Sequence, residues 1–237
     1  MAKIDDPSFE SELKQAQKDS VRDAFAKTPS ADGLADIGID AIDTAETFLK
    51  QFYEEDPPEQ PLACAAGCTF CCHQYVGLSM PELAILTKFI RSNFKDAQIE
   101  VLKNRLAEVL EKTKDMSRFE RTASKIDCPL LDQSTRQCSV YTERPLTYRA
   151  MHSLDRDACE ADDATPGKNH PIPQYQSHKV LIQSIAIGLQ LGLADNDIEP
   201  KELELTSALL LTLSKAEAID GWIEDQAEFD GTVVPKE

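Results

Sequence analysis

Apolar residues near the start of the chain recur at spacings of three and four, which is typical of amphipathic helices. The first stripe follows Pro7 and consists of Phe9, Leu13, Val21, Ala24 and Phe25. A longer stripe follows Gly33 and consists of Leu34, Ile37, Ala41, Ile42, Ala45, Phe48, Leu49 and Phe52. The charged, proline-containing segment 54–58 then breaks the pattern. We therefore predict two helices before this segment, with Gly38 weakening the first turns of the second.

The pattern after residue 75 predicts a short extended segment and two further helices. Residues 75–78 are compatible with a strand or with an extended connection. Ser79, Pro81 and Glu82 form a helix start, because serine can cap, proline fits the first turn and glutamate completes a capping box. This helix is expected to end near Asn93. The next begins at Asp96, and its expected buried stripe is Val101, Leu102, Leu106, Val109 and Leu110.

The last part of the chain predicts a helical hairpin. Residues 177–193 and 200–216 are rich in apolar side chains and are separated by the polar segment 194–197. From Gly221 onward the chain is acidic and is expected to fray, with Trp222 docking on the core. Residues 122–165 show no helical period and are expected to be irregular.

Together these elements predict a mainly α fold, a helical domain with two irregular cysteine-bearing loops that form a metal site. Residues 1–58 are expected to be an acidic N-terminal helical arm, and residues 59–165 the cysteine-cluster metal-binding domain. Residues 166–237 are expected to be a C-terminal helical hairpin that packs on this domain and ends in an acidic tail. The 237 residues suffice for one well-buried core or two small domains.

The net charge limits the classes of partner. The chain has 25 Lys and Arg against 42 Asp and Glu, a formal charge of −17. This excess repels nucleic acid and anionic lipid, so we expect neither nucleic acid nor a membrane as partner. Residues 1–60 carry fifteen acids and six bases, whereas residues 80–124 carry seven acids and nine bases. The acidic N-terminal arm could bind a protein partner or contact residues 80–124, and the simplest alternative is two solvated helix faces.

No segment has the pattern of a secretory signal or a membrane span. The first residues, Met-Ala-Lys-Ile-Asp-Asp-Pro, lack an apolar stretch, and no run approaches the ~18 apolar residues of a spanning helix. We therefore expect a cytoplasmic protein. Stable disulfides are uncommon in that compartment, and seven cysteines cannot all pair within one chain. Both facts favour metal ligands over structural cross-links.

Four of the seven cysteines lie in one short run, Cys-Ala-Ala-Gly-Cys-Thr-Phe-Cys-Cys-His. They are Cys64, Cys68, Cys71 and Cys72. A tight turn through Gly67 can point the first three sulfurs toward one centre. Neighbouring side chains diverge, so Cys72 suits a multinuclear cluster, a second nearby site or a spare position. Crowded thiolates are typical of metal sites or redox groups, since the thiolate both binds metal and attacks sulfur.

A second block places Cys128 and Cys138 on either side of a polar turn at residues 132–135. This hairpin-like turn could supply further ligands to the site that the first block begins. A local disulfide is the alternative, which the expected compartment disfavours.

The two cysteine blocks in this order resemble the YkgJ-like cysteine-cluster family. The resemblance also includes Val76, the capped helix bearing Glu82, and Arg144-Pro145 after the second block. This family is a zinc- or iron-chelating domain, and flagellin lysine N-methylases share a cysteine block with it. The resemblance covers about residues 60–160. It implies metal binding, with zinc or an iron–sulfur cluster as the cofactor. The metal ligands that it implies are Cys64, Cys68, Cys71, Cys72, Cys128 and Cys138.

The chain departs from the family pattern at one position. The family usually continues Arg-Pro-x-x-Cys-Arg, and here Tyr148 replaces that cysteine. Cys159 is the best substitute, because a thiolate replaces a thiolate without a change of charge, while His152 and His73 could serve as nitrogen donors. Arg144 and Arg149 could offset the negative charge of a thiolate site, and the alternative for Arg144 is a local acid such as Glu143 or Asp155.

Two other functions remain open from the residues. The spacing C-x3-C-x2-C is also that of radical S-adenosylmethionine enzymes, so an iron–sulfur enzyme related to flagellin lysine N-methylases is the alternative function. Those enzymes usually follow the motif with repeated strand–helix units, which this pattern does not predict. A thiol redox sensor using Cys71 and Cys72 is a third hypothesis. Catalytic residues are unknown, since no phosphate loop, nucleophile elbow or His-Glu-x-x-His run is present.

Overall fold

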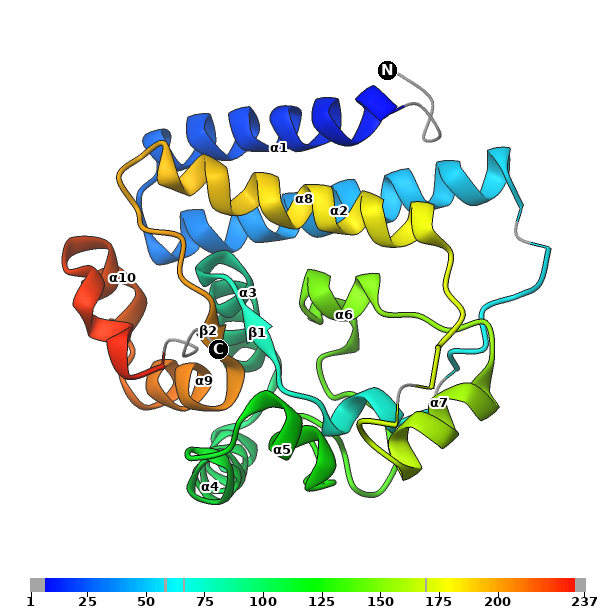
Figure 1. Ribbon diagram of the computed structural model, residues 1–237. Coiled ribbons are helices and arrows are strands. Elements are labelled where there is room, and N and C mark those ends of the chain that lie inside the picture. Colours follow the sequence, from blue (N-terminus) through cyan, green and yellow to red (C-terminus); the bar gives the residue numbers. More distant parts are fainter. Residues whose placement is uncertain (1–6, 58, 66, 169, 233–237) are drawn as a thin grey trace.

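Three long helices run along one side of the molecule and contact one another (Figure 1). The computed structural model describes residues 7–57, 59–65, 67–168 and 170–232. The long helices are α1 (Pro7–Lys27), α2 (Ala31–Glu55) and α8 (Gln176–Ala194). Both predicted N-terminal helices are therefore confirmed, and the Ser30 hydroxyl caps α2 by accepting the Gly33 N–H at 3.1 Å.

Helix α1 lies closely against α8 because glycines on α8 face it. A Cβ at Gly188 would come within 2.6 Å of the Lys14 carbonyl oxygen, and a Cβ at Gly192 within 2.5 Å of the Lys18 carbonyl oxygen. Larger side chains at these positions would force the helices apart. Phe9, 4% exposed, is packed into the same core that α8 contributes to. The N-terminal segment thus belongs to the central core of the protein.

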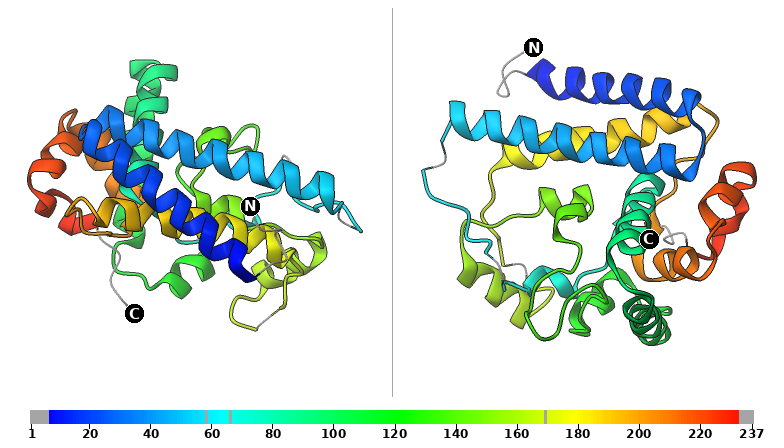
Figure 2. Two further views of the ribbon diagram at one scale, coloured as in Figure 1. Left: turned by 90° about the horizontal axis from the view of Figure 1, so that it is seen from above. Right: turned by 180° about the vertical axis from the view of Figure 1, so that it is seen from behind.

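A second group of helices lies below the long ones and beside the cysteine loops (Figure 2). It contains α3 (Met80–Asn93), α4 (Asp96–Thr113), α9 (Leu205–Ser214), α10 (Ala218–Glu224) and the 3₁₀ turn η3 (Gln226–Thr232). Helix α3 packs on α2, and α9 packs on α3 and α4. The capping box of α3 is confirmed, since Glu82 accepts the Ser79 N–H at 2.7 Å and its hydroxyl at 2.6 Å.

The predicted extended segment before α3 is a strand. Strand β1 (Gly77–Leu78) pairs antiparallel with β2 (Leu203–Glu204), with Gly77 opposite Glu204. The pairing fixes the chain just before α3 against the chain just before α9. The second apolar segment of the predicted hairpin therefore begins as a strand and becomes helical only at Leu205.

Four expectations about these elements are wrong. Val101 is 61% exposed, because α4 is covered on one face only and its buried residues are Leu102, Leu106 and Val109. The hairpin helices have different partners, with α8 against α1 and α2, and α9 against α3 and α4.

The other two concern the tail and the middle of the chain. The tail continues in α10 and η3 to residue 232, with Trp222 1% and Phe229 0% exposed, so only the docking of Trp222 is confirmed. Residues 233–237 lie outside the described part of the chain. The segment 122–165 contains α6 (Leu146–Ala150), α7 (Arg156–Ala164) and the end of α5 (Arg118–Ala123), which are too short to show a periodic stripe.

The whole is mainly helical, as predicted, and the first cysteine block lies in a loop region. One hydrophobic core extends from Phe9 to Phe229 and includes residues of all three predicted parts. The acidic α2 does contact the basic stretch, and their charges meet where Lys88 pairs with Asp32 and Asp36 at 3.1 Å each. No helix in the described ranges is both long and apolar enough to cross a membrane.

Candidate metal centre

The first cysteine block forms an irregular loop that ends in a 3₁₀ turn, η1 (Phe70–His73). Gly67 adopts φ = +85°, a left-handed conformation that side chains with a Cβ rarely take. The tight turn expected at Gly67 is thus present. Cys71 and Cys72 lie in η1, and Cys64 and Cys68 precede it on either side of the turn.

The second cysteine block is a small hairpin that is hydrogen-bonded to the first block. Leu131 and Cys138 form an isolated antiparallel bridge, and the Cys128 N–H donates to the Cys72 carbonyl at 2.8 Å. The sulfur of Cys128 accepts the N–H of Leu130, and the sulfur of Cys138 accepts the N–H of Val140. Backbone N–H donors aimed at sulfur stabilise thiolates in metal sites. The turn predicted to bring Cys128 and Cys138 together is therefore present, and both thiols are free.

Cys159 reaches the same region from a helix and not, as expected, from a loop. It lies in α7, whose first turn is capped by Asp155. Ser153 contacts two of the thiols, because its N–H donates to the sulfur of Cys64 and its hydroxyl reaches the sulfur of Cys159. The Ala63 N–H also donates to the Ser153 carbonyl at 2.8 Å. Cys64 and Cys159, ninety-five residues apart, are thus both hydrogen-bonded to Ser153.

His73 links the three cysteine-bearing segments to one another. Its Nδ1 lies 2.9 Å from Asp163 on α7, and its Nε2 lies 3.2 Å from Asp127, the residue before Cys128. Arg136 pairs with Asp127 at 2.9 Å, and Lys125 pairs with Asp163 at 2.6 Å. Both nitrogens of His73 are therefore used by carboxylates, and we name this arrangement the His73 clasp. It positions cysteines and leaves His73 no free nitrogen for a metal.

The seven thiols fall into two overlapping groups that share Cys71. One group surrounds Cys64, whose charge interacts with the other members of that group, namely Cys68, Cys71 and Cys159. The other surrounds Cys72, which interacts with Cys71, Cys128 and Cys138. Cys71 lies at the junction, because it interacts with Cys64 and Cys159 as well as with Cys72 and Cys138.

Within the pair at the junction, the proton is held by Cys72. The Cys72 thiol donates to Cys71, which lowers the pKa of Cys71 to about 7 and raises that of Cys72. Burial raises the pKa of Cys128 to about 12 and also raises the pKa of Cys138 and Cys159. Buried thiols of this kind become thiolates when a metal displaces the proton.

The donor set suits a thiophilic metal, although the side chains are not preassembled around one point. Among the described residues, no three Cys, His, Asp or Glu side chains converge closely enough to hold one ion as they lie. The chemistry nevertheless fits, since zinc and iron–sulfur clusters both take thiolate ligands. A second observation agrees with an anionic centre. The buried Nε of Arg144 has no hydrogen-bond partner, and the charge of Arg144 acts on Cys71 and Cys138.

Other residues considered from the sequence have different roles. Arg149 is buried and binds Glu46 and the Thr142 carbonyl, so its charge is used away from the thiols. His152 bonds the Ala150 carbonyl at 3.0 Å and accepts the Tyr175 N–H at 2.8 Å, which occupies both its nitrogens.

Tyr148, at the position of the missing family cysteine, lies beside Cys71, Cys72 and Cys128. Burial raises its pKa well above the usual value, so the phenol stays neutral there, and its hydroxyl donates to the Tyr75 carbonyl at 3.2 Å. The phenol therefore fills space beside the thiols and does not replace the missing thiolate.

The fold and this site define a mainly helical protein with a cysteine-rich segment whose donor set suits a metal. Residues 63–166 match the CxxCxxCC family, described as "Putative zinc- or iron-chelating domain". The match confirms the resemblance seen in the sequence, and it covers less than half of the chain. It supports metal binding without distinguishing zinc from iron. Searches of curated proteins and of solved structures found no match.

Three functional residues were not found from the sequence. Asp127 and Asp163 of the His73 clasp lie far apart in the chain, and the role of Ser153 depends on its backbone position. One signal was available, since Asp127 directly precedes Cys128 and Asp163 lies one helical turn after Cys159. The role of these two carboxylates is visible only in the folded chain, where both contact His73.

Proposed function

We propose that this chain is a cytoplasmic metal protein of the YkgJ-like family, whose seven thiols hold zinc or an iron–sulfur cluster. The observation that carries this proposal is the gathering of three cysteine-bearing segments by the His73 clasp and the Cys128–Cys72 hydrogen bond. The ligands would be Cys64, Cys68, Cys71, Cys72, Cys128, Cys138 and Cys159.

Two overlapping groups of four that share Cys71 suit a centre with more than one metal ion. Two tetrahedral four-thiolate sites with one bridging thiolate require seven thiolates, the number in this chain. This also gives Cys72 a role, because its charge interacts with Cys128 and Cys138, whereas the charge of its neighbour Cys71 interacts with members of both groups. Bound metal would fix the loops through ligation, and an iron–sulfur cluster would in addition supply electron transfer.

The test is anaerobic purification followed by metal and sulfide analysis and a visible spectrum. Colourless protein with about two zinc ions per chain and no labile sulfide would establish a binuclear zinc centre. Brown protein with stoichiometric sulfide would establish a cluster. Absence of both metals from protein produced in metal-supplemented medium would refute the proposal.

The ligand assignment is tested by single substitutions. Cys64→Ser, Cys128→Ser and Cys159→Ser should each reduce the metal content or the affinity for it, because each removes one thiolate. Ala65→Ser is the control, since it adds a hydroxyl to the exposed loop that carries Cys64 without removing a thiol. Retention of metal by Cys159→Ser at the level of Ala65→Ser would remove Cys159 from the centre.

The alternative, an S-adenosylmethionine-dependent iron–sulfur enzyme, has no structural observation in its favour. The described residues contain a single two-stranded antiparallel sheet in place of repeated strand–helix units. A visible spectrum that changes on addition of S-adenosylmethionine would reverse this preference.

The acidic N-terminal arm is the surface we propose for a protein partner. Asp36, Asp40 and Asp43 are exposed along α2, while its other face is buried in the core. Deleting residues 1–58 would remove α1 and α2 from that core, so charge reversal is the better test. The variant Asp40→Lys/Asp43→Lys should fold and lose the partner in a pull-down, whereas Glu108→Lys on α4 should retain it.

A further inference from the structure

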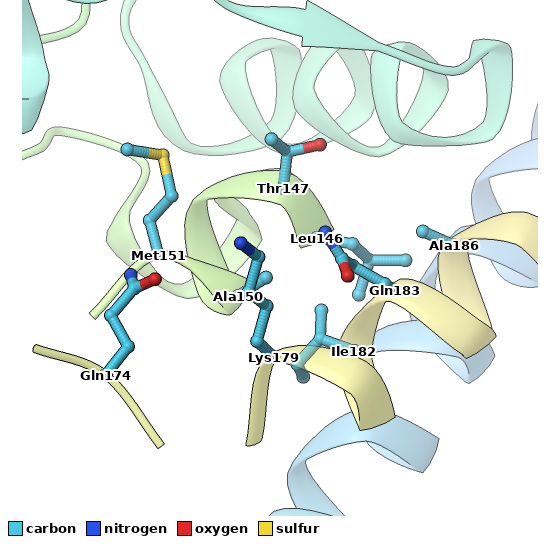
Figure 3. Close-up of a pocket in the computed structure, with 9 residues that line it drawn as sticks. All are labelled: Leu146, Thr147, Ala150, Met151, Gln174, Lys179, Ile182, Gln183 and Ala186. Carbon is cyan, nitrogen blue, oxygen red and sulfur yellow. The ribbon is translucent and has the colours of Figure 1, made fainter. Parts of the chain in front are cut away.

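A cavity of about 260 Å³ lies between α6 and the first half of α8, and no residue of the cysteine centre lines it (Figure 3). Its inner wall is apolar, with Leu146 and Ile182 both 0% exposed and Ala150 5% exposed. The wall is therefore fixed by core packing. Thr147 and Gln183 lie at its solvent-exposed rim.

Lys179 is the one charged residue that lines this cavity. In Figure 3 its side chain rises toward Ala150, between Met151 and Gln183. No carboxylate lines the cavity, although the chain has 42 acids and 25 bases. Within the described part of the chain, the Lys179 ammonium has no hydrogen bond or ion pair. A cation beside an apolar wall, without a neutralising acid, favours an anion from solution.

The groups around Lys179 supply hydrogen bonds and no competing charge. Gln174 is held in place because its Nε2 donates to the His152 carbonyl at 2.7 Å, which leaves its carbonyl and its second N–H free. Burial lowers the pKa of the neighbouring His152, whose nitrogens both have partners, so His152 stays neutral. Neither Gln174 nor the neutral His152 therefore compensates the positive charge of Lys179.

We propose that this cavity binds a small organic monocarboxylate with a short branched or linear apolar body. The carboxylate would pair with Lys179 and accept hydrogen bonds from the amides of Gln174 and Gln183. The apolar body would lie against Leu146 and Ile182. The volume is slightly below the usual range for drug-sized ligands, which begins at about 300 Å³, so the ligand is metabolite-sized.

The probe is 3-methylbutyrate, titrated by calorimetry into the protein as purified, with its metal. Saturable one-to-one binding is expected. The neutral isostere 3-methylbutyramide and 3-methylbutylamine should bind at least about tenfold more weakly, because they lack the negative charge. Inorganic phosphate should also bind more weakly, since it cannot use the apolar wall. Equal binding of acid and amide, or tighter binding of phosphate, would overturn the proposal.

Two variants and a control assign the binding to this cavity. Lys179→Gln should weaken 3-methylbutyrate binding about tenfold or more, and Ala186→Leu should weaken it by filling the cavity while keeping the charge. Lys168→Gln makes the same change of charge at an exposed position outside the cavity and should bind normally. Thermal melts and metal content establish that each variant is folded. Unchanged binding in Lys179→Gln would refute the site, whatever the metal analysis shows.

Discussion

At the scale of single residues, His73 is the centre of the candidate site although it is not a proposed ligand. Each of its carboxylate partners lies beside a cysteine, Asp127 next to Cys128 and Asp163 one turn from Cys159. The histidine therefore joins segments that are remote in the sequence. Replacing residues that orient ligands typically lowers metal affinity roughly 10- to 100-fold.

Replacing His73 by Gln should loosen α7 from the first cysteine loop, because a single amide cannot reproduce both carboxylate contacts. We expect Cys159 to be alkylated by iodoacetamide about tenfold faster in His73→Gln than in the wild type, as measured by mass spectrometry of peptides. The control is His170→Gln, whose imidazole contacts Thr165 outside the clasp. An unchanged alkylation rate of Cys159 would show that the clasp does not hold α7.

Arg144 is the second residue whose role follows from its surroundings. Its guanidinium lies 4.1 Å from the Tyr141 ring centroid, and its buried Nε has no partner. Arg144→Gln should weaken metal binding by roughly 10- to 100-fold in chelator competition, because an anionic thiolate centre would lose a neighbouring positive charge. Arg118→Gln, which removes a surface ion pair with Glu202, should leave the affinity unchanged. Equal affinities in both variants would exclude this role.

At the scale of elements, the contact between α1 and α8 depends on two glycines. Gly192→Ala should destabilise the protein by about 1–3 kcal/mol in urea unfolding, since the new methyl group would meet the Lys18 carbonyl and Val21. Gly221→Ala in α10 is the matched control. A Cβ there meets no atom within 4 Å, so alanine should stabilise by about 0.5–1 kcal/mol through its helix propensity. Equal effects of both substitutions would contradict the close crossing.

His178 couples α8 to α2 and α6 and makes the stability depend on pH. Its nitrogens bond the Tyr53 hydroxyl at 2.6 Å and the Arg149 carbonyl at 2.9 Å, and its ring stacks on His152 at 4.0 Å. Burial lowers the pKa of His178 to about 4 from 6.5. The unfolded chain therefore binds a proton more readily, and the contribution of neutral His178 is lost as the pH falls from about 6.5 to about 4.

The expected size of this loss is at most about 3 kcal/mol in the free energy of unfolding. Urea titrations between pH 7 and pH 4 should show a steeper decline for the wild type than for His178→Gln, which carries no titratable group there. Comparing the two proteins removes the effect of metal release, because both contain the same cysteines. Parallel stability curves would show that His178 is not buried as a neutral group.

At the scale of the whole molecule, the helical core and the first cysteine loop are held by different forces. The core cluster joins α1, α2, α3, α8 and α9 through apolar burial and includes Leu130 and Val140 of the second cysteine block, whereas no described residue of the segment 59–75 is buried. Removing metal with a chelator under reducing conditions should therefore preserve most of the far-ultraviolet helix signal. Limited proteolysis should then give new cuts in the first cysteine loop, at residues 59–65 and 67–75, which readdition of metal suppresses. Cooperative loss of the helix signal would show that the metal holds the entire fold.

Much of the helical architecture could be predicted because periodic burial leaves a direct trace in the sequence. The stripes of α1, α2 and α3 and the capping box at Ser79 are local patterns, and each formed as expected. The short helices α6 and α7 bury too few residues to show a period. Val101 was misplaced because a stripe cannot show how much of a helix face another element covers.

The sequence by itself determined the long helices, the cysteine blocks and the match of residues 63–166 to the CxxCxxCC family, since these depend on neighbouring residues and fixed spacings. The tertiary structure alone decided which remote groups meet. In the folded chain, α8 packs against α1 and not against α9. Cys64 and Cys159 both contact Ser153, and His73 lies between Asp127 and Asp163. Such contacts result from packing and hydrogen bonds between segments far apart in the chain, which no local pattern encodes.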